Sequence, residues 1–116
     1  MYEKLGRYHL DEDEKRIARA TVRLDDKLRR GKIRHRETPF DKRARAAVEK
    51  ANADMDIEPE LLDKIRANII SGITWEHSGE TYVGRDTFYR YARHYLYYVA
   101  RALGVVEDKP RKNGGG

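Results

Sequence analysis

Residues 85–103, RDTFYRYARHYLYYVARAL, decide the fold, because apolar side chains recur through them at helical spacing. When each residue advances by 100° around a helix axis, the apolar side chains gather on one side. Those residues are Phe88, Ala92, Tyr95, Val99 and Leu103. Gly104 follows directly and is a typical helix stop. The stretch therefore predicts a long helix with one face in the protein core.

The opposite face of this predicted helix is polar and mostly cationic. It consists of Asp86, Arg90, Arg93, His94, Tyr97 and Arg101. Guanidinium groups pair with phosphates and bind guanine edges in bidentate fashion, and a tyrosine ring can stack on a base. With Arg85 and Tyr89 of the first turns added, the face is our candidate DNA-reading surface. An ordinary solvated helix face is the alternative interpretation.

Several tyrosines of this helix lie off its apolar side. On the helical wheel Tyr89, Tyr97 and Tyr98 are too exposed to belong to the core. Tyrosine is favoured both in nucleic-acid contacts and in protein interfaces, so these rings fit either kind of partner.

Three further helices are expected upstream. Residues 11–30 have an apolar stripe of Ile17, Ala20 or Thr21, Leu24 and Leu28, with acids in the first turn and arginines in the last. Thr38 and Pro39 are typical of an N-cap and a first helical residue, which predicts a helix over 39–53. A third helix starts near residues 56–59 and ends at Gly72, and its apolar face is the densest in the chain.

The segment 73–84, ITWEHSGETYVG, is too short for a long helix and is interrupted by two glycines. It fits either one helical turn near Trp75 or a short hairpin. The whole pattern predicts an all-α fold. We expect a small helical bundle of four to five helices that ends in a helix-turn-helix-like unit.

The chain length corresponds to one domain. We expect a single helical domain over residues 1–106 and a disordered tail over 107–116, which has no apolar periodicity. The residues expected to meet in the core are Leu24, Leu28, Leu61, Ile65, Ile69, Trp75, Phe88, Tyr95 and Val99.

The chain has a net charge of +5, and the excess is concentrated in one region. Residues 27–50 contain ten basic side chains and three acidic ones. Such a local field attracts phosphate backbones or acidic protein surfaces. We therefore add Arg34, Arg36, Lys42 and Arg43 to the candidate DNA-binding residues.

Other chemistries have little support in the sequence. The chain has no cysteine, and its four histidines show no metal-ligand spacing. No catalytic motif or phosphate-binding glycine loop is present, so we expect no enzyme activity, metal or cofactor. No apolar run approaches a membrane span and no signal peptide is evident, so we expect no membrane association and a cytoplasmic location.

The C-terminal stretch WEHSGETYVGRDTFYRYARHYLYYVARALG resembles the end of phage late-gene transcription regulators of the RinA and ArpU type. In those proteins a sigma-region-4-like helix-turn-helix carries an "aliphatic, small, Arg, x, Thr, aromatic or small, x, Arg" pattern before a long helix. Here the pattern is occupied by Val83, Gly84, Arg85, Thr87, Phe88 and Arg90. The resemblance covers about the last 45 residues. Gly84 stands where these families usually have a capping side chain.

The resemblance implies a DNA-binding transcription regulator of phage or prophage type, which reads double-stranded DNA with the helix 85–103. RNA polymerase or another host protein is a further partner that such a role implies. The alternative is a small helical protein that binds and modulates a host enzyme. The sequence does not determine the oligomeric state, the DNA site or the direction of regulation.

Overall fold

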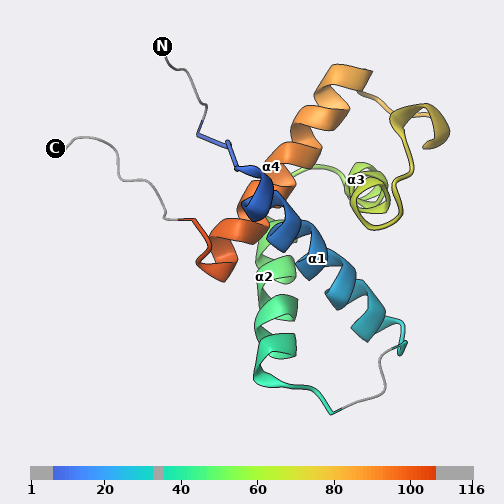
Figure 1. The fold of residues 1–116 in the computed structure, drawn as a ribbon. Helices are drawn as coiled ribbons and strands as arrows, with labels where there is room; N and C mark the ends of the chain where they lie inside the picture. The colour runs from blue at the N-terminus through green and yellow to red at the C-terminus, as the bar shows by residue number, and fades with distance from the viewer. Residues whose placement is uncertain (1–6, 33–35, 107–116) are drawn as a thin grey trace, which may run out of the picture.

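A computed structural model describes residues 7–32 and 36–106, and within them the fold is all-helical. The elements are α1 (Glu12–Arg29), α2 (Pro39–Met55), α3 (Pro59–Ser71), the 3₁₀ turn η1 (Trp75–His77) and α4 (Arg85–Leu103). They form a small helical bundle (Figure 1). None of the described helices is both long and apolar enough to cross a membrane. The expected tail, 107–116, lies outside the described residues.

Local sequence signals set the ends of the helices. Asp11 and Glu14 form a capping box at the start of α1, and Thr38 and Asp41 form another at the start of α2. α3 and α4 end at Gly72 and Gly104, where φ is +73° and +83°, a left-handed conformation that glycine adopts without steric cost. The expected helices were therefore correct to within one or two residues at most ends.

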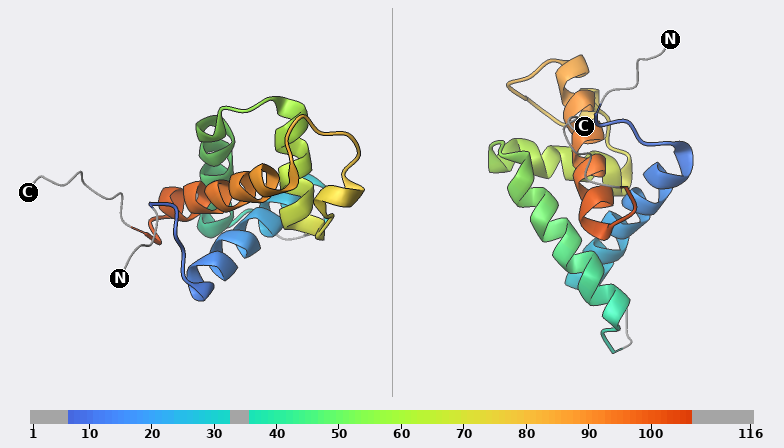
Figure 2. Two further views of the ribbon diagram at one scale, coloured as in Figure 1. Left: turned by 90° about the horizontal axis from the view of Figure 1, so that it is seen from above. Right: turned by 90° about the vertical axis from the view of Figure 1, so that its left-hand side faces the viewer.

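α4 is the central element of the bundle. It packs against α1, α2 and α3, most extensively against α2. Figures 1 and 2 show that α1 and α2 cross the C-terminal half of α4. The N-terminal half of α4 extends past this crossing, together with α3 and the connection that contains η1. One half of α4 is thus enclosed, while the other half has an open side.

The predicted core is confirmed in α3 and α4 and is wrong in α1. Ile65, Ile69, Phe88, Tyr95 and Val99 are fully or almost fully buried, Leu61 is buried, and Trp75 packs partly buried against the cluster. Leu24 and Leu28, in contrast, are only half-buried, and Ile17 is 45% exposed.

The face that α1 buries is offset from its apolar stripe. The residues that α1 buries are Ala18, Thr21, Val22 and Asp25. Small residues let α1 approach its neighbours closely, and Asp25 has a salt-bridge partner, so close packing and a polar contact select this face over the larger aliphatic side chains.

The connection between α3 and α4 contains η1 and no strand, so of the two expected forms the helical turn is correct and the hairpin is wrong. Trp75 fixes this connection to α4. Its backbone N–H donates to the Tyr89 hydroxyl at 3.1 Å, and its indole N–H donates to the Val83 carbonyl and the Thr81 hydroxyl, each at 3.1 Å. A single 3₁₀ turn thus occupies the place of the first helix of the expected helix-turn-helix.

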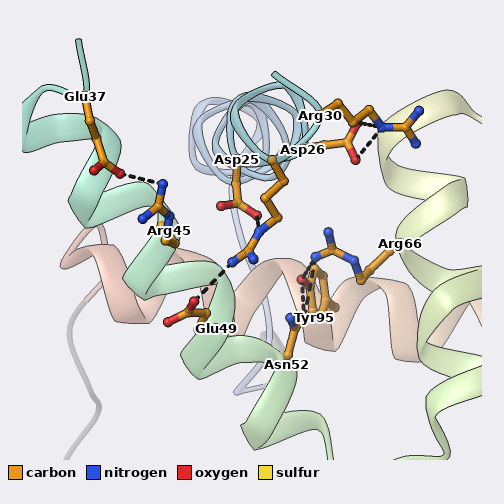
Figure 3. A network of polar contacts seen from close by, with 10 residues as sticks. Asp25, Asp26, Arg30, Glu37, Arg45, Glu49, Asn52, Arg66 and Tyr95 are labelled. Atoms are coloured by element: carbon orange, nitrogen blue, oxygen red, sulfur yellow. Dashed lines mark hydrogen bonds and ion pairs between the residues drawn. The ribbon is translucent and has the colours of Figure 1, made fainter. Parts of the chain in front are cut away.

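A hydrogen-bonded cluster joins three helices around Tyr95 (Figure 3). The Tyr95 hydroxyl donates to Asn52 Oδ1 of α2 at 2.6 Å and accepts from Arg66 Nη1 of α3 at 2.6 Å. Burial raises the pKa of Tyr95, so the hydroxyl stays neutral and can donate. The cluster satisfies the polar end of an otherwise buried ring.

Asp25 of α1 belongs to a second polar network, which joins α1 to α2 through Arg29. Its Oδ2 accepts from Arg29 Nε at 2.7 Å, and Arg29 also reaches Glu49 of α2 at 3.2 Å. The hydrogen bond that Arg29 donates to Asp25 raises the pKa of Arg29. The second oxygen of Asp25 is buried without a hydrogen-bond partner among the described residues.

Replacing Ile65 or Phe88 with alanine should lower the free energy of unfolding by about 2 to 5 kcal/mol, since each side chain is fully buried and its removal leaves a cavity. Leu24→Ala, at a half-buried position, should cost clearly less. Urea denaturation of the three variants measures the difference. Equal losses for Leu24 and Ile65 would contradict the packing of α1 described here.

Tyr95→Phe should lower the free energy of unfolding by about 1 to 3 kcal/mol, because Asn52 and Arg66 lose a buried partner. Tyr97→Phe is the matched control: Tyr97 is also buried, but its hydroxyl makes no hydrogen bond with the described residues. Its stability should be close to that of the parent. Coinciding denaturation curves for the two variants would show that the hydrogen bonds of Tyr95 do not stabilise the fold.

Candidate nucleic-acid interface

The N-terminal half of α4 presents four of the predicted DNA-reading residues to solvent. Arg85, Asp86, Arg90 and Arg93 are exposed. Arg85 forms an ion pair with Glu76 of η1 at 3.3 Å, and its guanidinium lies 5.7 Å from the ring centre of Tyr89. Arg90 and Arg93 form no ion pair with any described residue. Both guanidinium groups therefore remain available for a ligand.

Tyr89 has a structural role that the wheel did not predict. It is half-buried, its hydroxyl accepts the N–H of Trp75, and its ring meets the Phe88 ring edge-to-face at 5.2 Å. The ring thus links α4 to the η1 connection and fixes the first turns of the helix.

The C-terminal half of the predicted face is covered by the residues that precede α1. Tyr8 stacks on His94, with ring centres 3.7 Å apart, and meets Tyr97 edge-to-face at 5.4 Å. Tyr97 is only 4% exposed, so the expectation that it was too exposed for the core is wrong. The wheel failed here because it considers one helix and cannot include a segment that crosses it.

Arg101 is also engaged within the protein. Its Nη2 lies 3.3 Å from Asp54 Oδ2 of α2, and its guanidinium lies 5.7 Å and 5.1 Å from the ring centres of Tyr97 and Tyr98. Its side chain is 22% exposed. Arg101, like His94 and Tyr97, therefore does not belong to the accessible part of the predicted DNA-reading face.

A pocket of about 290 Å³ lies where the segment before α1 crosses α4. Lys15 of α1 and Arg90 and Arg93 of α4 line it, and none of the lining residues that the structure describes is acidic. The remaining lining residues are Tyr8, His9, Leu10, His94 and Leu96. Leu10 is buried in the core and anchors the segment against α4. The result is a cationic concavity with an aromatic and aliphatic wall.

The field inside this pocket is positive. The pKa of His94 is lowered, first by partial burial and then by the charges of Arg90, Arg93 and Arg7. Three guanidinium groups therefore act on one imidazole, which favours its neutral form. An anion that entered the pocket would have the opposite effect on the imidazole.

The other predicted cationic residues lie elsewhere. Arg36, Lys42 and Arg43 are exposed on and before the first turns of α2, and Arg34 lies outside the described residues. Arg43 lines a shallow pocket with Ala102 and Leu103, so it is near the C-terminal end of α4. The distance along a helix from there to the first turn is about 1.5 Å per residue, or roughly 25 Å. Arg43 and the exposed half of α4 thus belong to separate surfaces.

Ion pairs neutralise part of the basic region 27–50. Arg29, Arg30, Arg45 and Lys50 are each paired with a carboxylate within 4 Å. Figure 3 shows two of these pairs, Arg30 with Asp26 and Arg45 with Glu37, on the surfaces of α1 and α2. The charge count of the sequence therefore overestimates the free positive charge of this region.

The exposed half of α4 has the cationic pocket on one flank. Its other flank, on the side of α3 and the connection between α3 and α4, is acidic. Two open pockets that share Leu61 and Tyr82 lie on this side. Among the described residues, their charged lining consists of four acidic residues, Asp56, Glu58, Glu60 and Glu80, and of Lys64. Tyr82 is 80% exposed there. A phosphate backbone is repelled by this flank and attracted to the flank of Lys15, Arg90 and Arg93.

Sequence reasoning missed the contribution of residues 7–15. Arg7, Tyr8, His9 and Lys15 lie against or beside the cationic half of α4, although they are far from it in the sequence. One signal was present: Tyr8 and Leu10 are a short aromatic and aliphatic pair directly before the capping box of α1. Within the part of the chain that the structure describes, no group of three or more potential metal ligands is present.

Stability should decrease as the pH falls below about 6.5. The folded-state pKa of His94 lies below its unfolded value of about 6.5, so the unfolded chain binds more protons in this range. The contribution is fully present above pH 6.5 and is lost as the pH drops. His94→Gln should flatten this part of the profile of melting temperature against pH. An unchanged slope in the variant would show that His94 is not responsible.

Comparisons of the chain with protein-family models, with curated proteins and with solved structures find no match. The likeness to the phage regulators therefore remains a hypothesis carried by the residues of the C-terminal stretch.

Proposed function

We propose that the protein is a DNA-binding regulator of phage or prophage type, which contacts double-stranded DNA with the N-terminal half of α4. The observation that carries this proposal is the pair Arg90 and Arg93. Both side chains are exposed and have no ion-pair partner among the described residues. Asp86, Arg90 and Arg93 lie one to two turns apart on the same side of the helix, which suits a helix lying in a major groove.

The anchoring of this half of α4 supports the proposal. Hydrogen bonds from Trp75 join the η1 connection to Tyr89, and Phe88 fixes the same turn in the core. A helix held in this way presents its arginines in one orientation, which reduces the entropy lost on binding. Arg85 would exchange its exposed partner Glu76 for DNA at low cost, since such surface pairs contribute little to stability.

The residues in the enclosed half of the helix have a different part in this proposal. His94 and Tyr97 hold the segment before α1 against α4. Arg101 holds α2 against α4. Arg43 lies near the other end of α4, so it is not needed for contact with the same groove. The DNA-reading surface is therefore smaller than the sequence predicted.

A second candidate function is binding to a protein partner, and the acidic flank of α4 favours it. Tyr82 is 80% exposed in a groove that also contains Leu61 and Trp75. Exposed tyrosines beside apolar residues are typical of protein interfaces. In this alternative the partner is a host protein with a basic surface, and α4 supplies no DNA contact.

Arg90→Ala should weaken binding to the cognate DNA site by about 1 to 3 kcal/mol, the usual value of one good contact to a base. Arg43→Ala is the matched control, because it removes the same charge near the opposite end of α4. It should leave the affinity nearly unchanged. Gel-shift titrations with DNA from the neighbourhood of the gene, at two salt concentrations, measure both effects.

The salt dependence separates base reading from nonspecific attraction. The affinity should decrease with salt by about 0.9 logarithmic units of binding constant per logarithmic unit of salt for each phosphate contact. An equal effect of Arg43→Ala and Arg90→Ala would contradict our assignment of the reading surface. Absence of DNA binding at low salt, together with a protein complex that Tyr82→Ala disrupts, would favour the second candidate.

A further inference from the structure

We propose that the pocket between the segment before α1 and α4 is a binding site for one phosphate group. The inference deepens the proposed function and rests on it for the natural source of the phosphate, namely the DNA backbone beside the exposed half of α4. The phosphate chemistry itself follows from the pocket alone.

Three cationic side chains from two elements converge on the pocket. Lys15 comes from α1, and Arg90 and Arg93 come from α4. The two arginines have no ion pair with described residues, and Lys15 has only an exposed contact of 3.4 Å with Glu12. Arginine donates in a fork that matches phosphate oxygens, while lysine supplies a compact point charge. The set therefore provides both directed hydrogen bonds and positive charge.

The size and lining of the pocket suit a phosphate group. Its volume of about 290 Å³ exceeds that of a single phosphate, so it also has room for an attached sugar or for water. Among the described residues that line it none is acidic, so the exposed pair of Lys15 with Glu12 is the one contact there that competes with a ligand for the three cations. His9 and His94 offer ring nitrogens to an anion, and the hydroxyl of Tyr8 is held near that of Tyr98 at 3.5 Å.

The wall of the pocket is fixed before any ligand binds. Leu10 is 3% exposed, Leu96 is 5% exposed, and both belong to the hydrophobic core. Tyr8 is stacked on His94 and packs edge-to-face on Tyr97. A site with preformed walls loses less entropy on binding than a set of mobile surface lysines.

The positive field acts on His94 from all sides that are packed against it. Arg90 and Arg93 lie on its own helix, Arg7 and Tyr8 lie on the segment before α1, and Lys15 lies on α1. Besides partial burial, the charges of Arg90, Arg93 and Arg7 lower the pKa of His94, so a phosphate bound among them should raise it again. The imidazole is therefore a reporter inside the proposed site.

The test is a histidine NMR titration of the full chain, with and without inorganic phosphate at matched ionic strength. Phosphate should raise the pKa of His94 by about one pH unit, as expected for an opposite charge within a few ångströms. His77 on η1, which lies outside the pocket, is the internal reference and should not respond. A His94 pKa unchanged by phosphate, or a parallel change in His77, would overturn the proposal.

A double variant, Lys15→Gln with Arg93→Gln, provides the matched control. Without phosphate the pKa of His94 should already be higher, because the charge of Arg93 no longer acts on it. Phosphate should then shift it several-fold less than in the parent. Neither side chain belongs to the core, so loss of folding is not expected, and circular dichroism of the variant verifies this. A full phosphate response in the variant would contradict the assignment of the ligand-binding residues.

Two further ligands identify the source of the phosphate. Thymidine 5′-monophosphate offers a monoester, and a thymidine dinucleotide offers one phosphodiester. A response to the dinucleotide supports the pocket as a phosphate site and the DNA backbone as its ligand. A response only to inorganic phosphate and the monoester also supports the pocket, but with a free or terminal phosphate as its ligand. A His94 response in a protein that fails to bind DNA would contradict the proposed function alone. DNA binding without any His94 response would contradict the pocket alone.

Discussion

The structure depends on the burial of Tyr95 at the junction of three helices. Its ring is fully buried. Its hydroxyl donates a hydrogen bond to Asn52 of α2 and accepts one from Arg66 of α3. These short hydrogen bonds lie in a region of low dielectric, where a polar contact is strong and an unpaired polar group is costly. They specify one rotation of α4 about its axis. Everything that α4 presents to solvent follows from that rotation.

The same constraint divides α4 into two halves with different roles. In its C-terminal half, Leu96, Tyr97, Val99 and Ala100 are buried, and the helix is enclosed by α1, α2 and the segment that contains Tyr8. In its N-terminal half only Phe88 and Ala92 are buried, so the arginines on the other side remain accessible. The proposed DNA contact uses the accessible half, and the enclosed half provides the rigid support that such a contact requires.

The distribution of charge makes the two flanks of α4 unlike each other. Lys15, Arg90 and Arg93 surround the pocket on one flank, while the groove on the other flank contains Asp56, Glu58 and Glu60. At short range a phosphate is attracted by the first set and repelled by the second, and salt screens both effects over about 10 Å. An elongated polyanion would therefore approach from the side of the pocket. In the proposed complex this asymmetry would orient the protein on DNA without any contact to a base.

The sequence by itself determined the helices and most of the core. Capping residues, the glycine stops and the 3.6-residue period are local features, so the ends of α4 and the burial of Phe88, Tyr95 and Val99 could be predicted. Only the tertiary structure decided which polar side chains remain accessible. Tyr97 and His94 were on the solvent side of an isolated helix, yet Tyr8 covers them from about 90 residues away in the chain. For the same reason, small residues of α1 are buried in the core, whereas Leu24, which was predicted to lie there, is only half-buried. Burial is a property of the elements that meet in space, and the period of a single helix contains no information about which segment will cross it.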